Sequence, residues 1–203
     1  MKKIMFNDKY GLTSAVLNGK KTMTRRIILN EHRLYDDLNA ANKLYIHKDN
    51  TLRIDFGNCI ERKVIIPYKV CEVVAVAQSY KSIDKEILKQ GLPLDLKDEV
   101  KHHKGYNNKM FVKADDMPHR IRISDIKVER LQDISDEDCL KEGVFKWGDP
   151  FHEDRVEDFG FFVATKHYMT ARGAFAALID KVSGKGTWDS NPWVFAYSFE
   201  LLE

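Results

Sequence analysis

The eight residues from Gly19 to Arg26 (Gly-Lys-Lys-Thr-Met-Thr-Arg-Arg) bring together four cationic side chains and two hydroxyl groups. Lysine and arginine bind anions such as phosphate, while hydroxyls and backbone N–H groups orient them. A second interpretation is structural, because Gly19 is typical of a helix C-cap and cations are favoured at the C-terminal end of a helix. The composition of this basic block leaves both interpretations open.

The basic block is similar to the end of a phosphate-binding P-loop, but its surroundings differ. A P-loop has a glycine five residues before its Gly-Lys pair, where this chain has Ser14, and a helix after the loop. The apolar spacing of Leu12, Ala15 and Val16 predicts a helix before the block instead. The sequence therefore excludes a P-loop NTPase.

Composition indicates an ordinary soluble protein of 203 residues, with 43% hydrophobic and 32% charged side chains. Its apolar runs are shorter than a membrane span, and its first residues lack the apolar core of a signal peptide. We therefore expect a cytoplasmic protein that does not bind membranes. The net charge of +2 is too small to indicate nucleic acid by itself, so such binding would depend on cations gathered at residues 20–26.

The cysteines and histidines do not predict a metal site. Cys59, Cys71 and Cys139 are widely spaced, with no Cys-x-x-Cys pair, which is typical of buried thiols rather than of disulfides or zinc ligands. His102 and His103 are adjacent and lack the i, i+4 spacing of helical metal ligands. We expect neither a metal nor another cofactor.

Short β-prone runs recur along the chain, and turn residues such as Asp49-Asn50 and Gly57-Asn58 separate some of them. The pattern of the longest run changes phase at Ser124-Asp125, which predicts a bulge or a bend. Many short strands joined by tight turns favour a sheet that curls or closes. The predicted strands are residues 43–48, 51–56, 60–66, 72–77, 121–131 and 193–201.

Two helices have clear signals. Ser135 and Asp138 resemble a capping box and Gly143 ends the segment, while Thr170 and Gly184 bound an apolar helical repeat. Residues 84–110 and 145–168 are polar or irregular, so we interpret them as insertions in a single domain that spans residues 1–203. Insertions of this length are either binding loops and lids or disordered segments.

The basic block resembles the Gly-x-Lys-Thr-x-Thr-x-Arg signature of ASCH domains, small β-barrels of the PUA-like superfamily. Further blocks agree in order, although Cys71 stands where the family usually has glycine. The later blocks resemble the longer, phage-associated branch, and together the blocks span nearly the whole chain. They are Tyr68–Val76, Met117–Arg120, Val128–Asp138 and Trp188–Trp193.

The resemblance implies an α+β protein: a PUA-like barrel with flanking helices and a cleft associated with RNA or modified nucleosides. Some short members are amidohydrolases that act on N4-acylated cytidines. Their site combines the signature's lysine, second threonine and arginine with a glutamate on a later strand. The first three carry over to Lys21, Thr24 and Arg26, whereas the place of the glutamate falls on Arg122.

Arginine at position 122 changes the expected chemistry. A threonine hydroxyl becomes a good nucleophile only when a neighbour removes its proton, which a neutral lysine or a carboxylate can do and an arginine cannot. Arg122 beside Lys21 and Arg26 would concentrate positive potential and suit an anion better than a neutral amide. Asp125 or Glu72 could replace the missing carboxylate, so hydrolysis remains an alternative.

The aromatic residues near the C-terminus also allow two interpretations. They could stack on bases, or they could form the core, because alternate residues of a strand share one face. Asn191-Pro192 is a turn signal before this strand and favours the core. The residues concerned are Trp188, Trp193, Phe195, Tyr197 and Phe199.

These observations predict a protein that binds RNA or a nucleotide-like ligand in a basic cleft. The alternatives are an amidohydrolase acting on a modified nucleoside and a phage or mobile-element accessory protein that binds another protein. The predicted ligand-binding residues are Lys21, Thr24, Arg25, Arg26 and Arg122, of which Lys21, Thr24 and Arg26 would be catalytic in a hydrolase.

Overall fold

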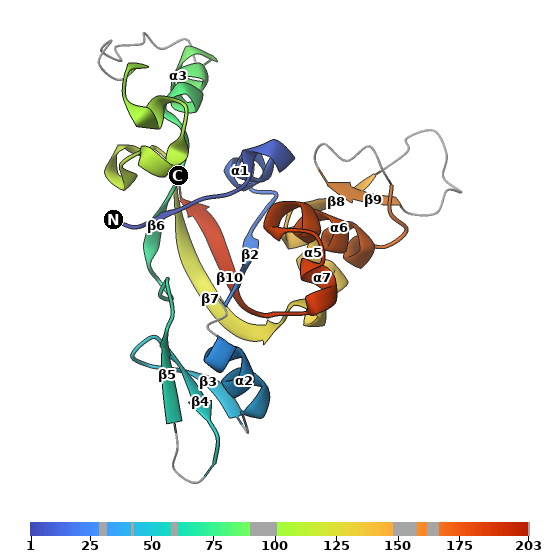
Figure 1. The fold of residues 1–203 in the computed structure, drawn as a ribbon. Coiled ribbons are helices and arrows are strands. Elements are labelled where there is room, and N and C mark those ends of the chain that lie inside the picture. The colour runs from blue at the N-terminus through green and yellow to red at the C-terminus, as the bar shows by residue number, and fades with distance from the viewer. Residues whose placement is uncertain are drawn as a thin grey trace.

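A five-stranded sheet forms the centre of the molecule in the computed structural model (Figure 1). The structure describes residues 1–28, 32–41, 43–57, 61–89, 101–147, 158–161 and 167–202. Strand β1 is parallel to β6, and the remaining neighbours are antiparallel. The strands in spatial order are β1 (Lys3–Ile4), β6 (Val73–Val76), β7 (Arg120–Arg130), β10 (Trp193–Leu202) and β2 (Met23–Ile27).

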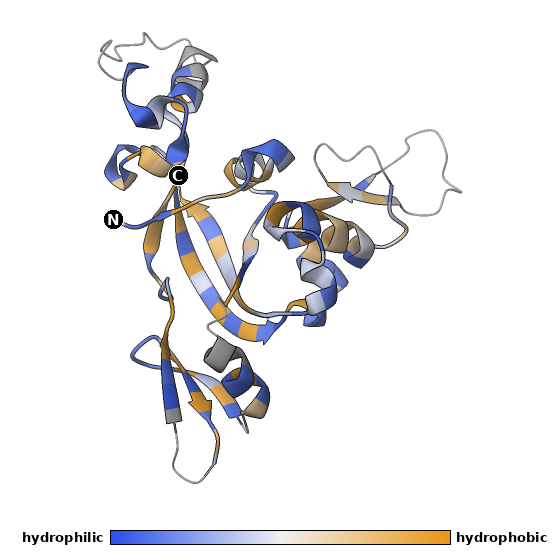
Figure 2. Ribbon diagram, in the orientation of Figure 1, coloured by the Kyte–Doolittle hydropathy of each residue, from blue (hydrophilic) through white to orange (hydrophobic). Residues whose placement is uncertain are grey.

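The bulge predicted at Ser124-Asp125 is confirmed. Asp125 pairs with Ser198 and Ile123 pairs with Phe199, so the register between β7 and β10 shifts and Ser124 has no partner in the ladder. On both sides of the bulge, hydrophobic and hydrophilic residues alternate along β7, as Figure 2 shows. The extra residue keeps apolar side chains on the core face although the sequence changes phase.

A second sheet confirms the predicted hairpins. It consists of three antiparallel strands, β3 (Lys43–His47), β4 (Thr51–Asp55) and β5 (Glu61–Ile65), and lies with helix α2 (His32–Ala40) at one end of the molecule (Figure 1). Asn50, in the first turn, has a φ of 59°, which suits the side-chain amide of asparagine. The second predicted turn is Gly57-Asn58, of which Asn58 lies outside the described residues.

Both predicted helices are confirmed, and each N-cap is the predicted residue, while the C-cap of the first is Glu142, one residue before the predicted end at Gly143. Ser135 Oγ accepts from Asp138 N at the start of α5 (Asp136–Lys141), and Thr170 Oγ1 accepts from Gly173 N at the start of α6 (Ala171–Ser183). Besides α2, the described residues form three further helices and five 3₁₀ turns. They are α1 (Leu12–Leu17), α3 (Tyr80–Lys89), α7 (Thr187–Ser190) and the 3₁₀ turns η1 (Asp8–Tyr10), η2 (Lys104–Tyr106), η3 (Lys109–Phe111), η4 (Ala114–Asp116) and η5 (Leu131–Asp133).

The segments interpreted as insertions contain regular structure. Part of α3 and the turns η2 and η3 fall within residues 84–110, and a hairpin of β8 (Val144–Trp147) and β9 (Asp158–Phe161) begins the segment 145–168. Residues 90–100, 148–157 and 162–166 lie outside the described part. None of the helices in the described ranges is both long and apolar enough to cross a membrane.

The expected α+β class is confirmed, but the expected closed barrel is not. Within the described residues no ladder joins the edge strands β1 and β2. The two edges meet through a side chain instead, since Arg26 Nη2 of β2 donates to the carbonyl oxygen of Met5, just after β1, at 2.6 Å. Over the residues that the structure describes, the central sheet is therefore curled, and no ladder closes it.

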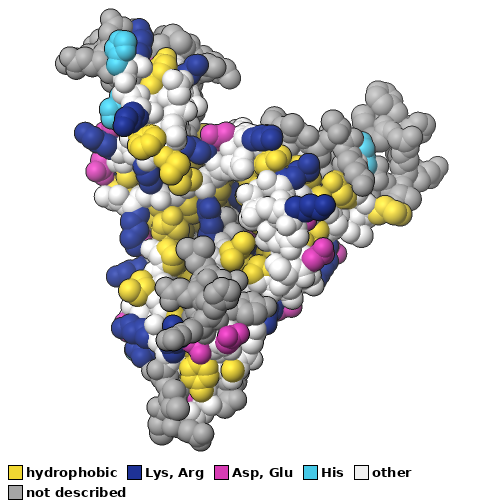
Figure 3. Space-filling view, viewed as in Figure 1, with side chains coloured by type: hydrophobic (Ala, Val, Ile, Leu, Met, Phe, Trp, Pro, Cys, Tyr) yellow, Lys and Arg dark blue, Asp and Glu magenta, His cyan; other side chains and the backbone are white. Residues whose placement is uncertain are grey.

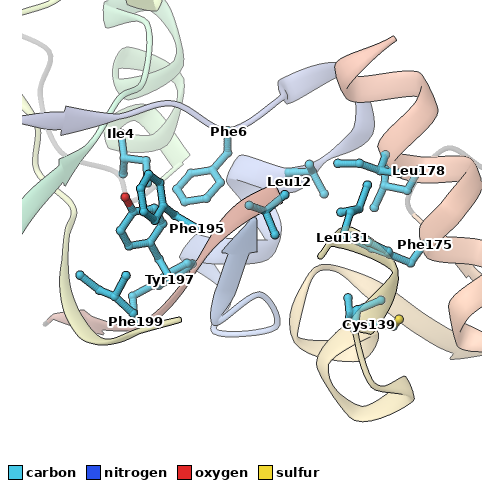
Figure 4. Packing of buried hydrophobic residues seen from close by; sticks show 14 of the residues in the cluster. Ile4, Phe6, Leu12, Leu131, Cys139, Phe175, Leu178, Phe195, Tyr197 and Phe199 are labelled. Atoms are coloured by element: carbon cyan, nitrogen blue, oxygen red, sulfur yellow. The ribbon is translucent and has the colours of Figure 1, made fainter. Parts of the chain in front are cut away.

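Three aromatic residues of β10 lie in the core inside this curl, as the core interpretation predicted, whereas Trp188 and Trp193 are only partly buried against it. Phe195, Tyr197 and Phe199 are at most 4% exposed, and Phe6 packs on Phe199 with a ring-centroid distance of 5.7 Å. Figure 4 shows Phe6 beside Phe195 and Tyr197, while Leu12 points toward Leu178 of α6. The core thus continues from the sheet to the helices, with the N-terminal segment between them.

Candidate active site

Strand β2 carries the second half of the basic block, from Met23 to Arg26, at an edge of the central sheet. Its Thr24 pairs with Tyr197 and its Arg26 pairs with Phe195, so both side chains share the face of these core aromatics. Arg25 pairs with Ala196 and lies on the other face. The basic block therefore divides between the two faces of the sheet.

A cavity of about 360 Å³ lies between β2 and helix α6, and we call it the central cavity. It brings together residues that are far apart in the sequence: the segment after β1, the basic block, the end of α5 and one face of α6. Its polar residues lie mainly on the β2 side and its apolar residues mainly on the α6 side. The lining comprises Met5, Phe6, Asn7, Leu12, Lys21, Thr24, Arg25, Arg26, Ile27, Glu142, Phe175, Leu178, Ile179, Val182 and Ser183.

Lys21 is held at this cavity by Glu142. Its ammonium lies 2.6 Å from Glu142 Oε2 and 2.6 Å from the Glu142 carbonyl oxygen, and its side chain is 2% exposed. A backbone hydrogen bond from Thr22 N to Lys141 O, at 2.9 Å, joins the start of β2 to the end of α5 and thereby fixes this approach. A carboxylate therefore does reach the signature lysine.

Burial lowers the pKa of Lys21 below its ordinary value, although Glu142 acts in the opposite direction. Arg26 and Arg25 lower it further by charge repulsion. A lysine with a lowered pKa is neutral more often and can then accept a proton. Glu142 at the same time provides the carboxylate that orients the ammonium group.

Three carboxylates surround Arg25 on the other face of the sheet. Its guanidinium lies 2.6 Å from Glu129, 3.2 Å from Asp138 and 3.2 Å from Glu142. Burial lowers its pKa, but the charges and hydrogen bonds of the three carboxylates together outweigh burial and raise it above the ordinary value. Because its charge is neutralised, Arg25 serves to hold Glu142 in place rather than to attract an anion.

Arg26 is the cation of the central cavity that has no carboxylate partner within the described ranges. Its Nη2 donates to the Met5 carbonyl, its Cζ lies 5.6 Å from the centroid of the Phe6 ring, and its buried Nε has no described hydrogen-bond partner. Cation–π contact with Phe6 orients the guanidinium. Arg26 is thus placed to donate to a polar ligand in the cavity.

Thr24 provides a hydroxyl at the same cavity. The residue is 5% exposed, and in the described part of the chain its hydroxyl makes no hydrogen bond. A hydroxyl at a cavity can donate to or accept from a polar group of a ligand, so Thr24 is suited to contact one there.

Arg122 lies elsewhere, and its predicted position beside Lys21 is wrong. It pairs with Glu200 across the ladder, on the face opposite to Thr24 and Arg26, and its Nη1 lies 2.9 Å from Glu200 Oε1. The reason is the pleat of β7, which directs Ile121 and Ile123 into the core and the residue between them outward.

The two carboxylates considered as replacements are also elsewhere. Glu72 contacts Lys2 at 3.0 Å, and Asp125 is an exposed residue of β7 opposite Ser198. Glu142 was missed because 121 residues separate it from Lys21 and no spacing rule connects them. The one signal near it was Gly143, the predicted helix end, whose φ of 101° directs the chain away from α5 and into β8.

On the face shown in Figure 3, Lys and Arg side chains are spread over the described surface and do not form one continuous basic patch. Among the described residues, no group of three or more His, Cys, Asp or Glu side chains could hold a metal ion.

Comparison with known proteins gives no match to a family model, to a curated protein or to a solved structure.

Proposed function

We propose that this protein hydrolyses the amide bond of an N4-acylated cytidine or a related modified nucleoside bound in the central cavity. The observation that carries the proposal is the contact between Lys21 and Glu142 at the cavity that Thr24 and Arg26 also line. Hydrolysis by a threonine needs a base beside the nucleophile, and a third group, here a carboxylate, orients the base. In the resembled family this carboxylate is a glutamate at the position of Arg122. Here Glu142 supplies it instead.

In the proposed reaction, Thr24 Oγ1 attacks the amide carbon while neutral Lys21 accepts the hydroxyl proton. Arg26 donates to the carbonyl oxygen as it becomes negative. The C–N bond then breaks, Lys21 returns the proton to the leaving nitrogen, and a threonine ester remains. A water molecule, deprotonated by Lys21, hydrolyses the ester to a carboxylic acid and regenerates Thr24.

We further propose that the central sheet belongs to a PUA-like barrel that is incomplete in its hydrogen bonding. The curled sheet and the approach of its two edges at Arg26 and Met5 support this proposal. So does Cys71, which has a φ of 65° at the position where the resembled family usually has glycine. A positive φ favours glycine, so this backbone conformation fits the family pattern even though the residue differs.

Binding of a nucleotide-like ligand without hydrolysis is the second candidate. It is favoured by Arg26, whose charge has no carboxylate partner in the described residues. The charges of Lys21 and Arg25 are neutralised, and Arg122 lies on the other face, so the cleft is less basic than the sequence predicts. This charge distribution favours one nucleoside-sized ligand over a length of RNA.

The test is release of cytidine from N4-acetylcytidine, followed by chromatography, with wild-type protein and Thr24→Val. Valine keeps the shape of threonine and removes the hydroxyl, so we expect turnover to fall by about 10⁶-fold, as when the nucleophile of a catalytic unit is removed. Thr22→Val is the matched control, because Thr22 precedes the same strand and does not line the cavity. Absence of turnover with measurable binding would support the second candidate, and absence of both would support a protein partner.

A further inference from the structure

Helix α6 presents one apolar face to the central cavity. Phe175, Leu178, Ile179 and Val182 all line it, and their spacing of three, four and seven residues places them on a single side of the helix. This face lies across the cavity from the polar residues of β2. The cavity therefore has a reactive wall and a hydrocarbon wall.

The hydrocarbon wall changes in exposure along the helix. Phe175 and Leu178 are each 2% exposed, Ile179 is 8% exposed, and Val182 is 36% exposed. Met5, on the opposite side of the lining, is 38% exposed. The wall thus extends from the buried core to an opening near Val182 and Met5. Figure 4 shows Leu12 and Leu178, which both line the cavity, pointing toward one another.

Acetyl is a small group for such a wall. An acetyl group has one methyl to bury, whereas the cavity of about 360 Å³ has room for a longer chain beside Ile179 and Val182, the more exposed residues of this wall. Each methylene that leaves water for an apolar environment favours binding by about fourfold. A binding site gains this energy only if the chain lies against the apolar wall while the amide remains at Thr24.

We infer that the α6 wall is an acyl-binding pocket and that the preferred substrates carry an aliphatic acyl group longer than acetyl. The inference rests on the proposed amide hydrolysis at Thr24. It assigns to α6 the recognition of the acyl half of the substrate. The nucleoside half would then contact the polar residues of β2 and lie toward the opening of the cavity.

The first experiment compares N4-acetyl-, N4-butanoyl- and N4-hexanoylcytidine as substrates. We expect kcat/KM to rise by about fourfold per added methylene until the wall is covered. Equal or falling kcat/KM from acetyl to hexanoyl would overturn the acyl pocket while leaving hydrolysis intact.

The second experiment measures binding of the same three compounds to Thr24→Val by calorimetry, which requires no turnover. Affinity that rises with chain length would support the acyl pocket even if no compound is hydrolysed, in which case the proposed function alone fails. Affinity that is independent of chain length would overturn the pocket.

A pair of variants tests whether α6 is the wall concerned. Val182→Asp places a carboxylate at the opening, and we expect the ratio of hexanoyl to acetyl kcat/KM to fall by about tenfold or more, the loss of roughly two methylene contributions. Lys181→Asp places a carboxylate at the adjacent exposed residue, which does not line the cavity, and should leave that ratio unchanged. Equal ratios in the two variants would overturn the assignment to α6.

Discussion

The ammonium group of Lys21 donates to Glu142 twice, to the side-chain Oε2 and to the backbone carbonyl oxygen, each at 2.6 Å. The same carboxylate also accepts from Arg25 at 3.2 Å. Glu142 therefore connects the reactive lysine with the arginine on the other face of the sheet, around the edge strand β2. The position of Lys21 depends on the end of helix α5 as much as on strand β2, which begins two residues later.

The pH dependence of turnover should report Lys21. Because burial lowers the pKa of Lys21, neutral lysine forms at a lower pH than for an exposed lysine, and kcat/KM should rise with pH through an apparent pKa below 10.5. Glu142 raises this pKa, so Glu142→Gln should move the rising limb to still lower pH. A pH–rate profile of both proteins, with folding checked by circular dichroism at each pH, makes the comparison. A limb that moves to higher pH in Glu142→Gln would contradict the assignment of Lys21 as the base.

Removal of one member of the buried Lys21–Glu142 ion pair should lower the free energy of unfolding more than replacement of both members. Glu142→Ala leaves two buried cations without this partner, so we expect the free energy of unfolding to fall by about 3–5 kcal/mol. The double variant Lys21→Met/Glu142→Leu replaces the pair by apolar side chains and should recover most of that loss. Urea denaturation measures both. Lys141→Ala, whose ion pair with Asp138 is about half exposed, should change stability by less than about 1 kcal/mol.

Gly143 should be required for the position of Glu142. Its φ is 101°, and an added Cβ would lie 3.1 Å from Leu12 Cδ2 and 3.7 Å from Lys21 Cδ. Gly143→Ala should lower the free energy of unfolding by about 1–3 kcal/mol and also reduce turnover. Gly186→Ala is the matched control, because Gly186 has a φ of 86° and no heavy atom within 4 Å of the added Cβ. If both variants lose stability and keep full turnover, Gly143 has no role in the site.

Cys139 and Cys71 should differ in reactivity toward thiol reagents. Burial, with a contribution from the charge of Asp136, raises the pKa of Cys139 to about 12, whereas Cys71 is exposed. At pH 8 we expect Cys71→Ser to slow labelling of the native protein and Cys139→Ser to leave it unchanged, because the thiolate is the reactive form. Labelling in denaturant should then reveal Cys139. A slower native reaction in Cys139→Ser would mean that the core opens at α5.

The sequence by itself determined most of the local structure. The capping residues Ser135 and Thr170 and the phase change at Ser124 depend on neighbours within a few residues, so their signals can be read directly from the chain. The alternation along β10 likewise identified its buried aromatics. The sequence also identified Lys21, Thr24 and Arg26, which the folded chain brings to one cavity.

Only the tertiary structure decided which charges meet. The predicted position of Arg122 beside Lys21 was wrong because the two faces of a strand alternate from residue to residue. The pleat of β7 places the Arg122 side chain on the outer face, where it meets Glu200. Glu142 reaches Lys21 because Thr22 and Lys141 join β2 to the end of α5, a contact between segments that no local pattern connects. The ionisation of Lys21 depends on that burial and on that partner, so the chemistry of the site was fixed by folding and not by the basic block alone.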